Sequence, residues 1–203
     1  MDAKTCLKKL GYVGTLAFTT VDEFGNPQVR NVSAIHYEEN SLYFYTAQGK
    51  NFCQELKATK KVQILGLTKY KEMIRLSGEV IYLEGNEAIK WRDVIFEEQP
   101  YLENVYPGET KDIGAVFMIK DAEIEYFNLS FYPIFRESYA IGSGQITPKG
   151  FKITNSCIGC GKCEQGCPQK AINPGTPYVI RQENCLHCGR CEVNCPVHAI
   201  ERL

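Results

Sequence analysis

The sequence predicts a mainly β protein, in which an antiparallel barrel with peripheral helices is followed by a small cysteine-rich domain. Between Gly11 and about Ser130, short runs rich in Val, Ile, Tyr and Phe alternate with turn residues, as in antiparallel sheets. Eight of the ten cysteines gather in the last quarter of the chain. Between Leu129 and Gly150 prolines and glycines interrupt the apolar period, which indicates a connection between two domains.

Length and composition limit the number and the size of these domains. The chain has 203 residues, of which 44% are hydrophobic, enough for a mid-sized core and a small second domain. We expect a first domain over residues 1–130, a linker over 131–150 and the cysteine-rich domain over 151–203. A formal net charge of −1 provides no basic field for nucleic acid or an anionic membrane. Without a signal peptide or an apolar run of membrane-spanning length, the sequence predicts a cytoplasmic protein.

The elements of the first domain follow from apolar period and turn chemistry. A hairpin is expected first, with strands over 12–21 and 28–37 joined by the turn that runs from Asp22 to Pro27. Period-two patterns predict further strands over 41–46, 62–68, 73–83 and 113–127. Helical spacing predicts helices over 50–59 and 86–97.

The cysteines of the last quarter form an internal repeat. The run that starts at Cys157 and the run that starts at Cys185 share the spacing CxxCxxCxxxCP. In this spacing three close thiolates hold one [4Fe–4S] cluster and the fourth cysteine reaches the other cluster. The predicted ligands are Cys157, Cys160, Cys163 and Cys195 for cluster one, and Cys185, Cys188, Cys191 and Cys167 for cluster two.

Other interpretations of the repeat are weaker. Iron takes soft thiolate ligands, and Gly161 and Gly189 let backbone amides approach the sulfides. Two structural zinc sites are the alternative, but zinc motifs rarely place three cysteines at such short intervals with a fourth before proline, twice. His187 lies inside the second motif, where the first has Gly159, and we expect an exposed neighbour that tunes the potential slightly.

The repeat resembles bacterial two-cluster ferredoxins over about residues 150–203. The similarity includes the matched pairs Ala171-Ile172 and Ala199-Ile200 that follow the two motifs. It implies a small α+β ferredoxin domain with two [4Fe–4S] clusters and a role in electron transfer. Disulfides are a poorer explanation of the cysteines, because the chain lacks the signal peptide that an oxidising compartment requires.

The first domain lacks both GxGxxG and GxxxxGK[ST], which argues against a doubly wound nucleotide-binding fold. It contains in order PQVRNVS over 27–33, LYFYTAQGKN over 42–51 and VQI over 62–64. This order resembles the FMN-binding split barrels of the pyridoxamine 5′-phosphate oxidase type, and more closely their nitroimidazole-resistance-like branch, over about residues 1–130. The resemblance implies a split barrel that forms a homodimer with FMN at the interface.

Seven residues acquire roles from this resemblance. The implied roles are phosphate pairing by Arg30 and Lys50, hydrogen bonding to the phosphate or ribityl chain by Thr46 and Asn51, and lining of the isoalloxazine by Asn31, Val32 and Ser33. Two cations and a helix N-terminus suit a phosphate dianion. Each residue also has an ordinary alternative, because Arg30 could be a solvated strand residue and Lys50 could simply open a helix.

A few side chains near this predicted site are weighed separately. Trp91 and the aromatic residues of 101–106 could cover the flavin from the second subunit, although aromatic residues at such positions more often form core. His36 is interpreted as a strand histidine without a catalytic role. Because it lies near the strand predicted to line the flavin, a role in proton transfer remains the alternative. Cys6 and Cys53 are expected to behave as small apolar residues. No catalytic residue is assigned.

The two predicted domains together imply an FMN- and iron–sulfur-dependent oxidoreductase. An external donor would reduce the clusters, and electrons would pass to FMN and then to a small acceptor such as a nitro compound, a quinone or another flavin. Reverse flow is equally compatible with the sequence. The substrate-binding arginine segment of true pyridoxamine phosphate oxidases is replaced here, so vitamin B6 oxidation is not expected. The alternative function is a non-enzymatic electron carrier or redox sensor that uses the barrel for dimerisation.

Overall fold

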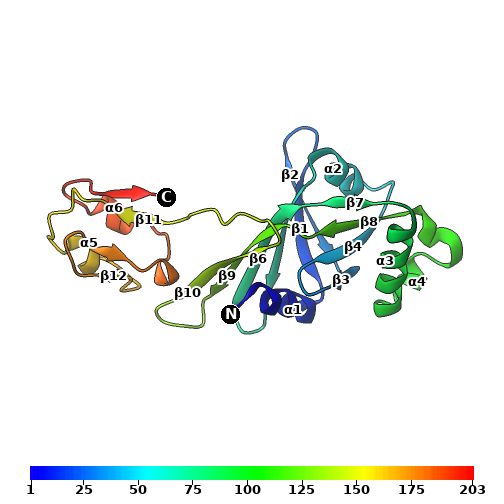
Figure 1. Ribbon diagram of the computed structural model, residues 1–203, viewed down its shortest axis with the longest axis horizontal. Helices are drawn as coiled ribbons and strands as arrows, with labels where there is room; N and C mark the ends of the chain where they lie inside the picture. Colours follow the sequence, from blue (N-terminus) through cyan, green and yellow to red (C-terminus); the bar gives the residue numbers. More distant parts are fainter. The chain divides into compact units, whose positions relative to one another are not determined.

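The computed structural model describes residues 1–203. The chain divides into two compact units, each built from segments that are separate in the sequence (Figure 1). Unit 1 comprises Met1–Thr68, Met73–Glu125 and Ser138–Gln145, and unit 2 comprises Lys69–Glu72, Tyr126–Glu137 and Ile146–Leu203. No helix is long and apolar enough to cross a membrane.

Helix α1 (Ala3–Val13) opens the chain. The Asp2 carboxylate accepts a hydrogen bond from a first-turn backbone N–H, and Gly14 ends the helix with φ of +77°. Such a left-handed residue is the usual helix terminator because glycine adopts it without steric cost. The strand predicted over 12–21 therefore begins only at β1 (Leu16–Val21), since the helix takes its first residues.

One sheet has six strands. Its order is β10 (Phe135–Ile141), β9 (Ala122–Asn128), β6 (Glu72–Glu79), β5 (Lys61–Leu67), β1 and β2 (Pro27–Val32). β1 pairs antiparallel with both β2 and β5, and β5 pairs antiparallel with β6. Along β5 exposed and buried residues alternate strictly, so Val62 and Ile64 point to the core. This period of two gives the sheet one apolar face.

The other sheet of the barrel has four strands. Its order is β3 (Ile35–Tyr37), β4 (Leu42–Ala47), β8 (Gly114–Ile119) and β7 (Ile81–Leu83). Three apolar runs that were each predicted as one strand, over 28–37, 73–83 and 113–127, are each divided between the two sheets. A period-two pattern continues through such a corner, so it does not show where a strand changes sheets. The predicted mainly β fold with antiparallel sheets and peripheral helices is confirmed.

An aromatic cluster joins the two sheets and helix α2 (Asn51–Thr59). Phe18 of β1 meets Phe44 of β4 edge to face, with ring centroids 5.0 Å apart. Phe117 of β8 stacks on Phe44 at 5.5 Å, and Phe52 of α2 lies 6.0 Å from both Phe18 and Phe44. Because these rings are buried, the first turn of α2 is fixed against both sheets.

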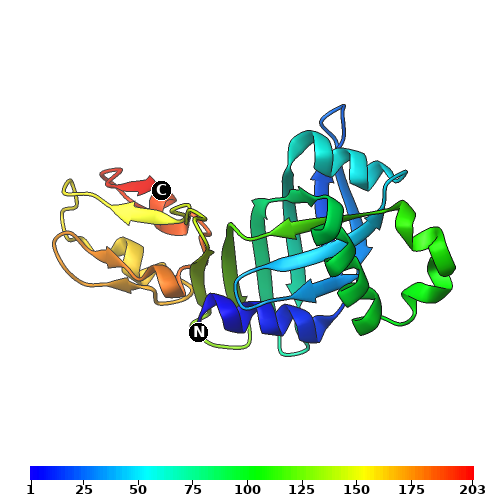
Figure 2. The same cartoon turned by 45° about the vertical axis from the view of Figure 1, so that its right-hand side comes forward.

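Helix α3 (Gly85–Glu98) lies against β3, β4 and β8, and Figure 2 shows it beside the four-stranded sheet. Its Trp91 stacks on Tyr43 of β4 with ring centroids 3.9 Å apart. Trp91 is thus packed against a hydrophobic cluster of the barrel. Two short helices follow, α4 (Leu102–Val105) and the 3₁₀ helix η1 (Gly108–Ile113).

The predicted linker over 131–150 contains the strand β10. Only Ile141 of this strand is buried, so its residues show no apolar period from which a strand could be predicted. Two glycines that were interpreted as interruptions are required by close packing instead. A Cβ at Gly142 would lie 2.3 Å from the Lys120 carbonyl oxygen, and one at Gly144 would lie 2.3 Å from the Ala122 carbonyl oxygen.

The cysteine-rich part of unit 2 is a small α+β fold. It contains β11 (Phe151–Ile153) paired with β14 (Ile200–Arg202), β12 (Ile172–Asn173) paired with β13 (Val179–Ile180), the short helices α5 (Lys162–Gln165) and α6 (Arg190–Val193), and the 3₁₀ helix η2 (Gln182–Asn184). Phe151, Ile172, Ile180 and Ile200 form its buried core. Five of the repeat cysteines pack in or against this core, namely Cys163, Cys167, Cys185, Cys191 and Cys195.

Gly114 of β8 provides a test of the barrel packing. A Cβ at this position would lie 1.9 Å from Cε2 of Tyr45, so Gly114→Ala must displace the Tyr45 ring or the strand. We expect the substitution to lower the free energy of unfolding by about 1–3 kcal/mol, as overpacking does. Denaturant titration measures this, with Gly49→Ala as the control because nothing lies within 4 Å of its added methyl. Equal losses in both variants would contradict the packing explanation.

Candidate functional site

A cavity of about 590 Å³ lies in unit 1 where β2, β4 and the start of α2 meet the α4 region. Its volume is within the range of small-molecule binding sites, about 300–1,000 Å³. All seven residues that the sequence predicted for a flavin line this cavity, namely Arg30, Asn31, Val32, Ser33, Thr46, Lys50 and Asn51. Segments far apart in the sequence therefore converge on one site, which we call the barrel pocket.

The pocket lies where strands of different sheets end. β2 of the six-stranded sheet contributes its last residues, and β4 of the four-stranded sheet contributes Tyr45 and the buried Thr46. The Tyr45 backbone N–H donates to the Ala34 carbonyl at 3.0 Å, which ties β4 to the chain just after β2. The chain then turns through Gly49 into α2, so Lys50 and Asn51 reach the same cavity.

The start of α2 presents unsatisfied donors to the pocket. Lys50 is the N-cap residue, and no side chain caps this end of the helix. The first backbone N–H groups of a helix have no partner within it, and together with the helix dipole they favour an anion. The Lys50 ammonium donates to the Tyr106 hydroxyl at 3.1 Å, so a cation stands at the same end. This corner of the pocket suits a phosphate group.

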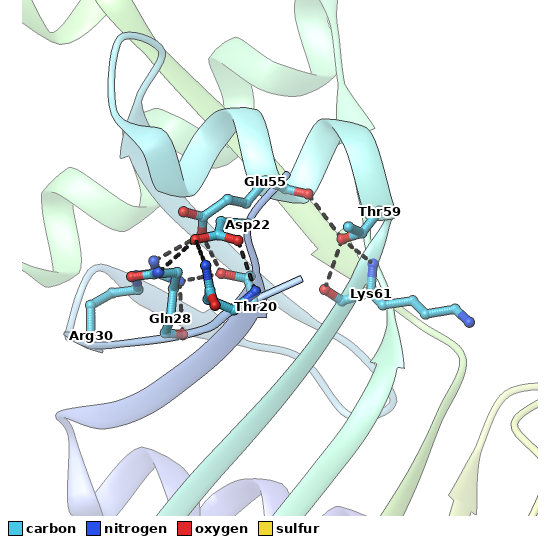
Figure 3. Close-up of polar contacts among 8 residues, drawn as sticks. Thr20, Asp22, Gln28, Arg30, Glu55, Thr59 and Lys61 are labelled. Carbon is cyan, nitrogen blue, oxygen red and sulfur yellow. Dashed lines mark hydrogen bonds and ion pairs between the residues drawn. The ribbon is translucent and has the colours of Figure 1, made fainter. Parts of the chain in front are cut away.

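Arg30 belongs to a buried polar network, which Figure 3 shows. Its Nη2 lies 2.8 Å from Oε2 of Glu55, and its Nη1 donates to the Thr20 hydroxyl and to the Gln28 carbonyl. The Thr20 hydroxyl in turn donates to the Glu55 carboxylate. The guanidinium carbon also lies 4.6 Å from the centre of the Phe52 ring. Arg30 is therefore held rigidly, and its charge is partly balanced by Glu55.

Glu55 is the residue that sequence reasoning missed. Its side chain is only 8% exposed, and it lines a second cavity of about 490 Å³ together with Asp22 and Asn51. The sequence contained a sign of this pair, because Glu55 lies between Phe52 and Leu56 on the apolar side of the predicted helix. A carboxylate buried on that side needs a cationic or hydrogen-bonding partner. Since Glu55 neutralises part of the Arg30 charge, Lys50 supplies the larger share of positive charge in the barrel pocket.

Tyrosines of the same chain complete the wall. The hydroxyls of Tyr101 and Ser33 are 2.6 Å apart, and the rings of Tyr106 and Tyr45 meet edge to face with centroids 5.2 Å apart. The 101–106 stretch, which could have covered a flavin bound to the second subunit, thus lines the pocket of its own chain. Burial raises the pKa of Tyr45 to about 12, so this phenol stays protonated and can donate a hydrogen bond.

His36 and Trp91 lie outside the set of residues that lines the pocket. The His36 Nδ1 is 2.9 Å from the Glu98 carboxylate, and its Nε2 is 3.1 Å from the Glu38 carboxylate. The imidazole also packs against Trp91, with ring centroids 5.1 Å apart. Both ring nitrogens are occupied by carboxylates, which supports the interpretation of His36 as a structural histidine.

A separate cavity in unit 2 is lined by cysteines. Cys167, Cys185, Cys188 and Cys191 all border it, and they are the four ligands predicted for cluster two. Three of these residues come from the second motif and Cys167 from the first, so the two motifs meet here as the shared ligand sets require. Of the other predicted set, Cys163 and Cys195 pack against the same small core. Cys6 and Cys53 are fully buried in unit 1, as expected of small apolar residues.

Backbone geometry in the two motifs is matched. Gly161 and Gly189 both have left-handed backbones, with φ of +74° and +76°. The Ala171 backbone N–H donates to Sγ of Cys167 at 3.3 Å, and the Ala199 N–H donates to Sγ of Cys195 at 3.2 Å. The alanines that follow each motif therefore have a structural role, since their amides donate to the fourth cysteine of that motif.

The donor set suits a cluster better than a single metal ion. Burial raises the pKa of the Cys191 thiol to about 11, so binding of iron must displace its proton. A zinc ion draws four donors to one centre, whereas cluster thiolates bind separate irons. Cys167 of the first motif lines one cavity with three cysteines of the second, which is the crossing that a two-cluster site requires.

Comparison with known proteins agrees with this chemistry. Residues 156–199 match the family described as the 4Fe-4S dicluster domain. The C-terminal segment is a 4Fe–4S dicluster domain. A ferredoxin from Butyribacterium methylotrophicum is 50% identical to the chain over 30 residues, which are 15% of this chain and 54% of the ferredoxin. The chain thus spans about half the length of this curated relative.

Solved structures resemble the rest of the chain. A NimC/NimA family protein from Clostridium acetobutylicum is 27% identical with a TM-score of 0.58, over 68% of this chain and 91% of that one. An FMN-binding protein related to pyridoxamine 5′-phosphate oxidase, from Nostoc punctiforme, is 16% identical with a TM-score of 0.53, over 68% and 93%. The second likeness concerns the fold alone. The predicted fusion of a split barrel with a dicluster domain is confirmed.

The Arg30–Glu55 pair generates a stability prediction. Arg30→Met leaves the Glu55 carboxylate buried without its ion-pair partner, a change that costs about 3–5 kcal/mol in fully buried pairs. We expect the free energy of unfolding to fall by about 3 kcal/mol or less, because the Arg30 side chain is 24% exposed and the pair is not fully buried. The double variant Arg30→Met/Glu55→Leu removes the unpaired charge and should recover most of the loss. Urea unfolding of both single variants and the double variant gives the coupling energy, and strictly additive losses would contradict the pairing.

Proposed function

We propose that this protein is an FMN- and iron–sulfur-dependent oxidoreductase that passes electrons between two [4Fe–4S] clusters and FMN to reduce a small acceptor. A nitro compound, a quinone or another flavin is the proposed acceptor class, and an external redox partner exchanges electrons with the clusters. The protein would act as a homodimer with FMN at the interface. One observation carries the proposal, namely that a chain with a dicluster domain also has a pocket lined by all seven residues predicted for FMN.

The phosphate of FMN would be held at the start of α2. Its two negative charges would face the Lys50 ammonium and the uncapped backbone N–H groups of the helix. The Tyr106 hydroxyl keeps Lys50 at this corner, and Arg30 adds a guanidinium that Glu55 holds in place. Thr46 and Asn51 line the same end and would donate hydrogen bonds to the phosphate or the ribityl chain.

The flavin ring would lie along the end of β2. Asn31, Val32 and Ser33 line this part of the pocket, and Val32 offers an apolar surface while Ser33 is fixed by its hydrogen bond to Tyr101. In unit 2 the eight repeat cysteines would hold the clusters, with apolar side chains such as Ile172 and Ile180 limiting the access of water. The bound groups would supply one-electron transfer at the clusters and paired-electron chemistry at the flavin.

Cofactor content tests this proposal directly. Protein purified without oxygen should contain about eight irons and about one FMN per chain, measured by iron assay and by the fluorescence of released flavin. Iron without flavin, also after incubation with excess FMN, would refute the oxidoreductase and support the carrier or sensor. Flavin without iron would refute the cluster assignment.

Lys50→Gln tests the phosphate corner. The loss of a charged hydrogen-bond donor should weaken FMN binding roughly 10- to 100-fold, measured by quenching of flavin fluorescence. Riboflavin lacks the phosphate, so its affinity should stay nearly unchanged in the same variant. Lys61→Gln is the charge-matched control, because Lys61 is exposed at the start of β5 and does not line the pocket. A variant that loses riboflavin and FMN affinity equally would show that Lys50 does not act on the phosphate.

A further inference from the structure

The residues of 132–136, which precede the cysteine repeat, contact the second cluster site within unit 2. The Tyr132 hydroxyl donates to the Pro168 carbonyl at 3.2 Å. The Ile134 backbone N–H donates to the Gln169 side chain at 2.8 Å, and the Asn184 side chain donates to the Ile134 carbonyl at 3.0 Å. This segment, called here the 132–136 segment, is therefore part of the dicluster unit.

These hydrogen bonds are made to residues next to two of the four ligands predicted for cluster two. Pro168 and Gln169 directly follow Cys167, and Asn184 directly precedes Cys185. Cys167 and Cys185 both line the cavity predicted for cluster two. The 132–136 segment thus fixes the chain on both sides of this cavity.

Arg136, at the end of the segment, reaches into the second motif itself. Its Nη1 donates to the His187 imidazole, with 2.9 Å between Nη1 and Nε2. His187 stands between Cys185 and Cys188 with a left-handed backbone, φ +57°, where the first motif has Gly159 at +71°. A left-handed backbone is costly for a residue other than glycine, and His187 adopts it beside the Arg136 guanidinium.

The other charges match within the two CxxCxxCxxxCP runs, and the copies differ just after these runs, where Lys170 of the first corresponds to His198 of the second. Lys162 and Arg190 occupy the same place in each motif, and so do Glu164 and Glu192. Arg136 is a half-buried cation whose guanidinium contacts the second motif through His187. The nearby acids Glu137 and Glu183 are exposed, so water screens them more strongly than it screens Arg136.

We propose that Arg136 raises the reduction potential of cluster two above that of cluster one, so that the first electron taken up by the chain resides on cluster two. Reduction adds negative charge to a cluster, and a nearby half-buried cation stabilises the reduced form. The inference rests on the proposed cluster ligands and not on the flavin pocket. Arg136 is a positioning and tuning residue for this cluster and not one of its ligands.

The test is a redox titration of the full-length protein without oxygen, followed by electron paramagnetic resonance. The unaltered chain should show two reduction steps. In Arg136→Gln the higher-potential step should move to more negative potential, with a roughly tenfold smaller reduction constant, or about 59 mV for one electron. The lower step should stay in place. No shift, a shift of the lower step only, or equal shifts of both steps would overturn the proposal.

Matched variants separate charge from structure. Arg136→Lys keeps the charge and should retain most of the potential, whereas Lys152→Gln removes an exposed cation paired with Glu201 and should move neither step. Iron content is measured first, so a chain without clusters would refute the ligand assignment before any titration. If Arg136→Gln loses iron, Arg136→Met serves instead, because it removes the same charge and keeps an unbranched apolar stem. It should shift the same step in the same direction, and an unchanged potential would overturn the proposal.

Discussion

The barrel pocket depends on where the first turn of α2 is anchored. Phe52 is buried between Phe18 and Phe44, so the residues just before it must emerge at the junction of the two sheets. One turn later Glu55 ties the helix to Arg30 of β2. A helix fixed at its N-terminus keeps its free N–H groups and Lys50 in place before any ligand arrives, and such preorganisation lowers the cost of binding an anion.

A comparable constraint governs the dicluster unit. Each predicted ligand set takes three cysteines from one motif and the fourth from the other, and Cys167 lines one cavity with three cysteines of the second motif, as this crossing requires. With these ligand sets neither motif would complete a site alone. Cluster binding and folding of this unit would then be coupled, because the core that packs around the thiols is small.

Local patterns predicted most of this architecture. The cysteine spacing placed the dicluster domain, and two short segments of the first domain, 27–33 and 42–51, contain the seven residues that were predicted for FMN and that line one pocket with others. What the sequence did not show depends on contacts through space. An apolar run does not show the corner at which its strand changes sheets, and β10 has no apolar period. Glu55 and Arg136 gain their roles only from partners that are distant in the chain.

The 132–136 segment changes how the cysteine repeat is understood. The two CxxCxxCxxxCP runs carry the same charges at the same places, so residues within these runs would give the two clusters similar electrostatic surroundings. A preference of the electron for one cluster then depends on residues outside these runs. Arg136 lies before the repeat and donates to His187, at a position in the CxxC loop that has a left-handed backbone in both motifs but carries glycine in the first. The 132–136 segment would therefore make the two proposed cluster sites chemically distinct.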